Sequence, residues 1–547
     1  MAKRYLLLLA FFCLFIGMWA TVKPRKGGRA VQSEHQIESS SPSTSETDCR
    51  SPMKIGLHSN APLTSLGSPK VPVVLVQYSD KKFTSGLGTY IDENGNELKN
   101  ECTSDEDAAL VNSYYKTFCN GDGSHNYDYQ TVYGGITDYF RDQSNGLFTP
   151  EFVIIGPVTL SEGYAYYGEN SESSKDKNIR SFYSESITLA QSLMTDWSQF
   201  DNDSNGSCDM VFFIYAGEGE NGCDDPNTIW PKESASGGSI NGTRYGCYAC
   251  CNEIYNDNPD GIGVFVHELS HALGLPDFYD VGYKAYGMDY WDIMDSGCYN
   301  NYGYTPSNYT AYEREFMGWL DIETLDPEDG VRELTLSPMS AFGNAYKIVN
   351  PENSNEYYIL ENKQSTDWDL FVGRGTVRTK MHGLMITHVD YQQSSWTSNR
   401  VNTDIDHQRM TIMPADGALY SYMDVNNTDD FNDYMNSAIR DLFPGYDNVK
   451  EFSGEAQYVF TESGSTPHQM GQPLFDITEN EDGSMTLYYM GLPDAINGLF
   501  ANPKHGVGVF DITGVRVGTT DIEYGNPTRL PNRPGVYVVN GKKYIKD

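Results

Sequence analysis

Residues 264–277 read Val-Phe-Val-His-Glu-Leu-Ser-His-Ala-Leu-Gly-Leu-Pro-Asp, and this stretch is the centre of the predicted fold. On an α-helix, His267 and His271 are four residues apart, so both imidazoles leave the same face and can bind one cation, as zinc requires. Glu268 then stands beside the open coordination position, where its carboxylate can take a proton from a zinc-bound water. We therefore predict an active-site helix with two metal ligands and a general base.

The end of this helix predicts a third ligand. Gly274 tolerates the positive φ of a sharp turn, and the proline at position 276 prevents the helix from resuming. The turn brings Asp277 back toward the metal, where a carboxylate oxygen is an acceptable zinc ligand that leaves the fourth position for water or a substrate carbonyl. The nearby Asp280 is an alternative third ligand.

Two further residues extend the predicted site. Met294 follows Asp277 by 17 residues, within Tyr-Trp-Asp-Ile-Met-Asp-Ser-Gly at 290–297, and resembles the methionine turn that underlies the zinc of metzincins. Tyr299 could donate a hydrogen bond to a tetrahedral oxyanion, although a packing role is the alternative. A chance His-Glu-x-x-His on an ordinary amphipathic helix is the competing explanation, which the longer pattern disfavours.

Motifs outside this helix carry a family resemblance. They are Gly-Ser-Pro-Lys-Val-Pro-Val-Val-Leu-Val-Gln-Tyr (67–78), Asp-Tyr-Phe-Arg-Asp-Gln-Ser-Asn-Gly-Leu-Phe (138–148), Tyr-Ala-Gly (215–217), Thr-Ile-Trp-Pro (228–231) and Ala-Tyr-Glu-Arg-Glu-Phe-Met-Gly-Trp (311–319). With these motifs the chain resembles the immune inhibitor A family of secreted bacterial zinc metalloproteases over residues 67–320, and more loosely to about 490. The resemblance implies a zinc cofactor and protein or peptide substrates.

Length and charge bound the organisation and the partners. A chain of 547 residues is too long for one core and favours three or four units. Its 38 basic and 75 acidic residues give a net charge of −37, and no basic stripe is evident, so nucleic-acid binding is not expected. Solubility and calcium-binding loops are the expected uses of the acidity.

The N-terminus predicts export. Residues 1–20 combine a short basic start with an apolar run too short to span a bilayer, which is typical of a signal peptide, and no later segment is long and apolar enough to cross a membrane. Residues 21–66 are basic and then Ser/Thr-rich, as in a propeptide or disordered linker. We expect a protein secreted to the medium or the cell surface of a Gram-negative bacterium.

The ten cysteines predict disulfides. Cys13 lies in the signal and Cys49 in the following segment, where it is either a latency thiolate or an unpaired prosegment cysteine. The other eight lie between residues 102 and 298, and an even set in an exported domain favours disulfides whose pairing the sequence does not give. A second metal-binding site formed by Cys247, Cys250 and Cys251 is the weaker alternative.

Residues 201–209, Asp-Asn-Asp-Ser-Asn-Gly-Ser-Cys-Asp, indicate a structural calcium site. Asp201, Asp203 and Asn205 place oxygens at alternate positions, the glycine at 206 permits the sharp turn, and Asp209 can close the cage. The loop lacks the glutamate of a complete EF-hand at its twelfth position. An Asx-rich turn without an ion is the alternative.

The predicted fold is an α/β zincin-like catalytic domain at 67–320, with a mixed sheet and the active-site helix. Strands are expected at 71–78, 152–155 and 209–216, helices at 136–141 and 179–194, and polar loops at 80–130. The strand at 209–216 is the candidate for pairing with an extended substrate.

After residue 320 the pattern changes to short strands separated by turn residues. This predicts a β-rich accessory domain at 321–495 and a small β tail at 504–547. The tail resembles the C-terminal sorting tail of type IX secretion substrates, which implies attachment at the cell surface. An accessory β-domain without sorting function is the alternative.

These features together predict a secreted zinc endopeptidase that hydrolyses extracellular proteins through a metal-activated water. The rival function is a non-catalytic adhesin or glycan-binding protein on a zincin scaffold. Glu268 argues against this rival, because a binding module has no use for a base at that position.

Overall fold

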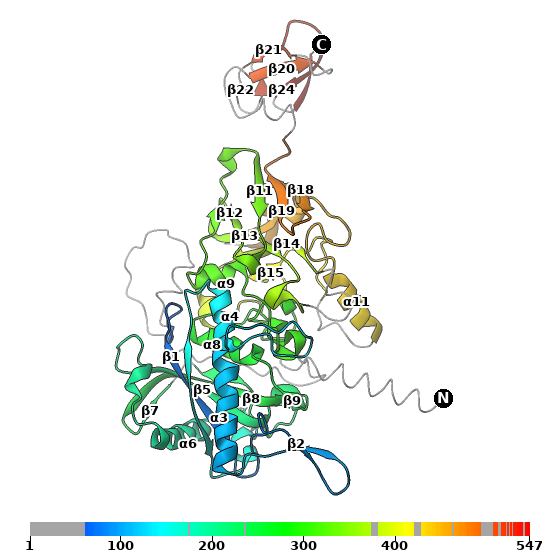
Figure 1. Ribbon diagram of the computed structural model, residues 1–547. Helices are drawn as coiled ribbons and strands as arrows, with labels where there is room; N and C mark the ends of the chain where they lie inside the picture. Colours follow the sequence, from blue (N-terminus) through cyan, green and yellow to red (C-terminus); the bar gives the residue numbers. More distant parts are fainter. Residues whose placement is uncertain are drawn as a thin grey trace.

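The structure is a computed structural model, and Figure 1 shows its course. The described residues are 61–172, 175–234, 237–372, 381–420, 428–461, 464–493, 507–511, 516–520, 522–523, 526–527, 529–539 and 542–546. The predicted signal peptide, residues 21–60 of the predicted propeptide, Cys13 and Cys49 lie outside these ranges. In the described part of the chain, no helix is both long and apolar enough to cross a membrane.

A seven-stranded mixed sheet forms the centre of the first half of the chain. Its main path runs β4-β1-β5-β8-β6, and β7 and β9 also pair with β8. Neighbours from β4 to β8 are parallel, whereas β6 runs antiparallel to β8. The bounds are β1 (Lys70–Gln77), β4 (Glu151–Thr159), β5 (Cys208–Glu218), β6 (Lys232–Ser234), β7 (Ser239–Ile240), β8 (Thr243–Tyr255) and β9 (Asn258–Pro259).

Helices cover both faces of this sheet, as the alternating β and α pattern predicts. Val74 and Val76 of β1 pack with α6 (Ile179–Leu193) in one core cluster. Val73 and Leu75 point the other way and share a second cluster with the remaining long helices. These are α3 (Asp105–Asn120), α4 (Ile136–Gln143) and α8 (Gly263–Ala272), and the shorter ones are α5 (Tyr164–Gly168), α7 (Glu220–Cys223) and α9 (Ala311–Phe316).

Residues 80–130 are predicted to be polar and rich in loops, and this expectation missed their regular elements. They contain the hairpin of β2 (Thr89–Ile91) and β3 (Glu97–Lys99) and the 16-residue helix α3. Ser104 and Asp107 form a capping box at the start of α3, and Val111, Tyr115 and Cys119 bury one stripe at steps of four residues. The polar residues between these positions hide the helical period in the sequence.

The expectation that β5 pairs with substrate is wrong. Both edges of β5 are already occupied, by β1 and by β8. The strand at the end of the path is β6, which contacts α8. An extended peptide can add only to a strand edge with unpaired backbone groups, so β6 takes the place of β5 as the candidate.

Residues after 320 form the predicted short strands. One sheet has the order β10-β12-β13-β14-β15 and another has the order β11-β19-β18. The bounds are β10 (Glu323–Thr324), β11 (Arg332–Leu336), β12 (Tyr346–Asn350), β13 (Asn353–Lys363), β14 (Gly383–Asp390), β15 (Met410–Ile412), β16 (Tyr458–Thr461), β17 (Gly464–Gln469), β18 (Leu474–Glu479) and β19 (Met485–Tyr489), with helices α10 (Gln393–Thr397) and α11 (Thr428–Ala438).

One hydrophobic core crosses residue 320. The cluster around α8 continues into residues of β13, β14 and β15 and of the segments between them. The Trp368 ring lies 4.6 Å from the Tyr133 ring, and the Trp291 indole donates a hydrogen bond to Asp441 at 3.2 Å. The predicted accessory region is therefore packed against the catalytic region through a shared interior.

The C-terminal strands have a small core of their own. β20 (Val507–Asp511), β21 (Arg516–Thr520), β24 (Gly535–Val539) and β25 (Lys542–Lys546) form a four-stranded sheet, and β22 (Ile522–Glu523) pairs with β23 (Asn526–Pro527). Val509, Tyr537 and Val539 are its buried residues. This group ends the chain in Figure 1.

The predicted disulfides are not formed in the structure. All eight cysteines between residues 102 and 298 are free, and seven of them are buried. Cys250 belongs to the core on the α6 face of the sheet, whereas Cys247 and Cys251 belong to the opposite core, because neighbouring strand residues point to opposite faces. These thiols therefore pack as small apolar side chains.

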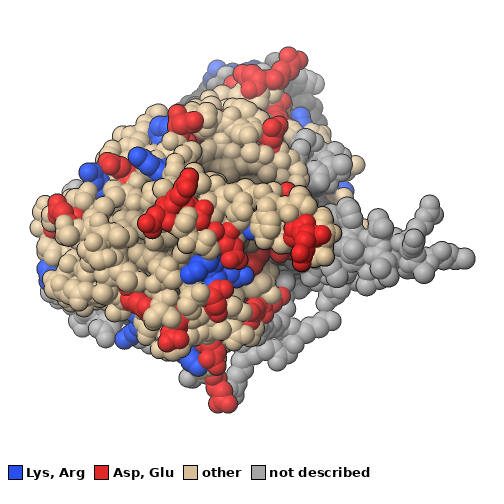
Figure 2. All heavy atoms as spheres, turned by 60° about the horizontal axis from the view of Figure 1, so that its bottom comes forward, with Lys and Arg blue, Asp and Glu red and all other residues tan. Residues whose placement is uncertain are grey.

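Charge is dispersed on the surface that Figure 2 shows. Acidic side chains are scattered over this face, and Lys and Arg occur in small separate groups between them. The described residues of this face thus form no continuous basic stripe that could follow a phosphate backbone.

Candidate metal centre

Helix α8 carries the two predicted histidine ligands. It spans Gly263–Ala272, and nearly all of its residues are buried in the core beside the central sheet. The chain then turns as predicted: the Gly274 N–H donates to the His271 carbonyl at 2.9 Å, and Gly274 has a φ of +104°. A side chain would strain this backbone, so the glycine is what allows the chain to return toward the histidines.

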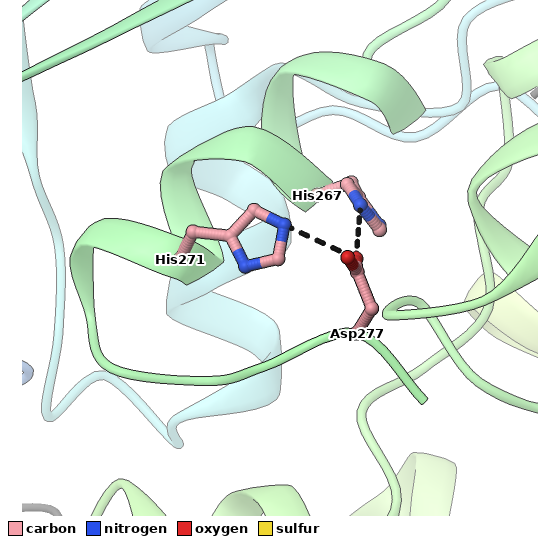
Figure 3. Close-up of side chains that lie close together, drawn as sticks. All are labelled: His267, His271 and Asp277. Atoms are coloured by element: carbon pink, nitrogen blue, oxygen red, sulfur yellow. Dashed lines mark ion pairs between the residues drawn. The ribbon is translucent and has the colours of Figure 1, made fainter. Parts of the chain in front are cut away.

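His267, His271 and Asp277 converge on one point. The Asp277 Oδ1 atom lies 3.2 Å from Nε2 of each histidine, and Figure 3 shows both rings directed at this carboxylate. Three ligands of a tetrahedral zinc, each about 2.1 Å from the metal, are separated by about 3.4 Å. The observed separations are close to this value, so the three residues fit a zinc ion.

Backbone carbonyls fix the orientation of both imidazoles. Nδ1 of His267 donates to the Ile293 carbonyl, and Nδ1 of His271 donates to the Leu275 carbonyl, each at 2.8 Å. A carbonyl oxygen can only accept, so each proton sits on Nδ1 and each Nε2 is directed toward the carboxylate. This is the arrangement that metal-binding histidines need.

The charges in the centre are coupled. Burial would lower the pKa of His271, but the carboxylates of Asp277, Glu268 and Glu233 together outweigh burial and raise that pKa to about 10. Burial would likewise raise the pKa of Asp277, but the imidazoles hold it well below its ordinary value. Metal ligation requires neutral imidazole, so a metal that binds here displaces a proton from His271.

Comparison with known proteins identifies this part of the chain. Residues 63–320 match the family described as immune inhibitor A peptidase M6, catalytic domain. Residues 63–320, slightly less than half of the chain, are thus similar to a peptidase M6 catalytic domain and are called the M6 domain below. This domain includes α8, the turn after it and all three converging residues, and a metalloprotease family implies a metal.

Two relatives resemble the chain beyond chance. Immune inhibitor A of Bacillus thuringiensis subsp. alesti is 25% identical over 335 residues, which cover 52% of this chain and 47% of the relative. Pre-pro-metalloprotease PrtV of Vibrio cholerae serotype O1 (strain M66-2) is 25% identical over 240 residues, which cover 37% of this chain and 26% of the relative. The chain thus spans about half of the first relative and about a quarter of the second.

Glu268 lies within the M6 domain beside the first histidine. It is 7% exposed, and burial raises the pKa of its carboxyl although the neighbouring His267 and His271 oppose this effect. A second carboxyl, Glu233 on β6, interacts electrostatically with His271 and Glu268, and burial raises its pKa to about 8. Glu233 was not predicted from the sequence because it lies 30 residues before the start of α8 without a recognisable spacing.

Asp280, the alternative third ligand, is engaged in a turn. Its Oδ1 accepts a hydrogen bond from the Gly282 N–H, and its Oδ2 accepts from the N–H groups of Lys284 and Ala285, at 2.7–3.0 Å. Asp277, in contrast, faces both histidines. The geometry therefore favours Asp277 as the ligand.

Met294 lies in a tight turn against α8. The Ile293 carbonyl beside it accepts the hydrogen bond from His267, and the Met294 carbonyl accepts a hydrogen bond from the Phe278 N–H at 2.9 Å. The Met294 side chain is fully buried. This turn therefore contacts both the first histidine and the residue after Asp277, and its role as a methionine turn stays a prediction.

The structure places the predicted Tyr299 in a packed setting. It lies in a 3-10 segment, Ser296–Gly303, where its ring contacts the Tyr255 ring and its hydroxyl accepts a hydrogen bond from the Asn221 amide. Its role at an oxyanion stays a prediction. Tyr279 was not predicted from the sequence. Its ring stacks on the His267 ring with centroids 6.5 Å apart. Its position two residues after Asp277 is the signal that could have indicated a place near the metal.

The structure brings the three aspartates of the predicted calcium loop together, and the amide of Asn205 donates a hydrogen bond to Asp203 at 2.7 Å. Ligand atoms of Asp201, Asp203 and Asp209 lie within 4.8 Å of one another, and Gly206 has the expected positive φ of +83°. The side-chain oxygen of the fourth, Asn205, accepts a hydrogen bond from the Ser207 N–H at 2.9 Å.

Asp209 differs from the other two aspartates because it is 3% exposed. Its Oδ2 accepts a hydrogen bond from the Asn202 amide at 2.9 Å, whereas its buried Oδ1 has no hydrogen-bond partner among the described residues. Burial raises the pKa of this carboxyl to about 6. A cation would satisfy the buried oxygen and lower that pKa.

Proposed function

We propose that this protein is a secreted zinc-dependent endopeptidase that hydrolyses peptide bonds of extracellular proteins. The observation that carries the proposal is the convergence of His267, His271 and Asp277 beside Glu268 in an M6 domain. When bound, zinc would lower the pKa of a water and polarise the scissile carbonyl. Peptide turnover by the purified full chain tests the proposal, with Glu268→Gln as its matched variant.

The chain's own residues have separate roles in this proposal. The Nε2 atoms of His267 and His271 and the Oδ1 atom of Asp277 hold the metal, in the orientation that the Nδ1 hydrogen bonds fix. Glu268 accepts a proton from the attacking water and then donates it to the leaving amine nitrogen. An extended substrate would pair with the edge of β6, which runs beside α8.

Secretion is part of the proposal because residues 1–20 have the pattern of a signal peptide. No observation favours the adhesin alternative. A buried carboxyl that interacts electrostatically with the ligand triad supports catalysis, since binding alone would not need the costly burial of Glu268.

We also propose that Asp201, Asp203 and Asp209 hold a structural calcium ion. Its support is the buried Asp209 oxygen without a hydrogen-bond partner, together with the sharp turn at Gly206. Asn205 is the proposed fourth ligand through its side-chain oxygen, which also accepts a hydrogen bond from the Ser207 N–H.

Calcium is expected to raise the melting temperature of the purified protein. Binding to the folded form alone stabilises it by about 2.7 kcal/mol at a hundredfold excess over the dissociation constant. Asp203→Ala should abolish the shift. Asp92→Ala is the matched control, because Asp92 caps a similar exposed turn at 2.8 Å from two backbone N–H groups, and it should keep the shift. If added calcium does not change the melting temperature of the wild-type protein, the proposed calcium site is refuted.

We further propose that the C-terminal β group serves delivery to the cell surface and not catalysis. Its support is the separate core of Val509, Tyr537 and Val539, whose strands pair only among themselves in the described chain. Sorting by a type IX system rests on the resemblance of the tail alone.

Truncation after residue 502 is therefore expected to leave peptide turnover of purified protein unchanged and to alter its location in the producing cells. The catalytic interior stays intact, because none of the proposed ligands or core residues of the M6 domain lies in the removed segment. Turnover assays and cell fractionation measure the two effects. A folded truncated protein without turnover would assign the tail to the enzyme, and an unchanged location would remove the sorting role.

A further inference from the structure

The side chain of Asn399 forms two hydrogen bonds with Asp277. The Asp277 N–H donates to Asn399 Oδ1 at 2.7 Å, and Asn399 Nδ2 donates to Asp277 Oδ2 at 2.5 Å. The two residues are 122 positions apart, and Asn399 is only 4% exposed. Asn399 also lies beyond residue 320, where the match to the M6 family ends.

These two hydrogen bonds determine which carboxylate oxygen of Asp277 faces the histidines. An amide offers an acceptor and a donor on one rigid end, so the backbone N–H of Asp277 fixes which way the amide points. Its NH₂ group must then face Oδ2, which leaves Oδ1 directed at Nε2 of both His267 and His271. Asn399 therefore holds Asp277 so that only one of its carboxylate oxygens, Oδ1, is available to the metal.

The segment that carries Asn399 is itself held against the M6 domain. Asn399 has a φ of +54°, a left-handed conformation that asparagine tolerates better than most residues. Three residues earlier, the Trp396 indole donates to the Tyr312 hydroxyl at 2.7 Å. Three residues later, Asn402 donates to the Phe278 carbonyl at 2.7 Å, next to Asp277.

We propose that Asn399 is a positioning residue of the metal centre, contributed by the region outside the M6 catalytic domain. The inference rests on the proposed function, because Asp277 is a ligand there. It assigns part of the metal affinity to a residue of the accessory region. Hydrogen-bonded partners of metal ligands typically contribute about 10- to 100-fold to metal affinity.

The test measures zinc affinity of the full chain by competition with a chromophoric chelator, without any assay of activity. Asn399→Ala should weaken zinc binding by about 10- to 100-fold. Asn402→Ala is the matched control, because it removes a hydrogen bond to the same loop but none to the Asp277 carboxylate. We expect it to keep the affinity within about threefold of the wild type, below the range of a ligand partner.

Several outcomes would overturn the inference. Wild-type affinity in Asn399→Ala would do so, and so would an equal loss in both variants, which would assign the effect to the loop in general. Circular dichroism of the metal-free variants checks folding, and Asn399→Ser replaces Asn399→Ala under the same criteria if the alanine variant does not fold. Failure of the wild type to bind zinc would instead refute the proposed function itself.

Discussion

The Glu268→Gln variant is expected to lose peptide turnover by about 10²- to 10⁴-fold while it keeps its zinc. Glutamine has nearly the same shape as glutamate, but its amide cannot accept a proton from water at neutral pH. The three residues that would hold the metal are unchanged, so metal content should stay at the wild-type level. Turnover of a fluorogenic peptide and metal analysis of the same sample measure both effects.

Glu233→Gln is the matched control for this variant. Glu233 is a buried carboxyl near the same centre, and burial raises its pKa to about 8, which favours the neutral form. Glutamine imitates that neutral form, so turnover should change by less than about tenfold, below the range of a general base. Turnover retained by Glu268→Gln would remove the general-base assignment.

A chain that ends at residue 320 is expected to be insoluble or unfolded. The cut removes many buried partners of the M6 domain, including Trp368 and Trp396. Each large apolar side chain in such a core contributes about 1.5–3 kcal/mol, so losing the ten or more that lie beyond residue 320 exceeds a typical total stability of about 5–15 kcal/mol. Soluble yield and a thermal melt of the purified product measure the effect.

The cut also breaks polar contacts. It would remove the side chain of Glu361, which accepts a hydrogen bond from the Ala311 N–H at 2.7 Å, and that of Asp369, which accepts from the Asn308 N–H at 2.9 Å. Truncation after residue 502 is the control, because it spares these contacts. A soluble, cooperatively melting product that ends at residue 320 would contradict the shared core.

The sequence predicted the metal centre because its determinants are local. His267, Glu268, His271 and Gly274 lie on one helix and its turn, where spacing alone sets direction. Asp277 follows closely enough for the same turn to place it, although only the structure distinguished it from Asp280. Strands β1, β4 and β5 of the central sheet were likewise visible as apolar runs, whereas β8 was not predicted.

The features that the sequence did not reveal depend on contacts between distant segments. Asn399 reaches Asp277 across 122 residues, and no spacing rule connects them. The core that crosses residue 320 was hidden because a change of pattern from helices to strands suggests separate domains. The cysteine count suggested disulfides, but a count does not say that Cys250 and Cys251 lie on opposite faces of one sheet.

The coordination shell of the bound zinc tests the central claim most directly. X-ray absorption at the zinc edge of the purified, metal-loaded chain should show two imidazole nitrogens and light oxygen ligands at about 2.0–2.2 Å. This result is expected from His267, His271 and Asp277, which converge in the structure. Sulfur ligands at about 2.3 Å would place the zinc on the cysteines and contradict the account.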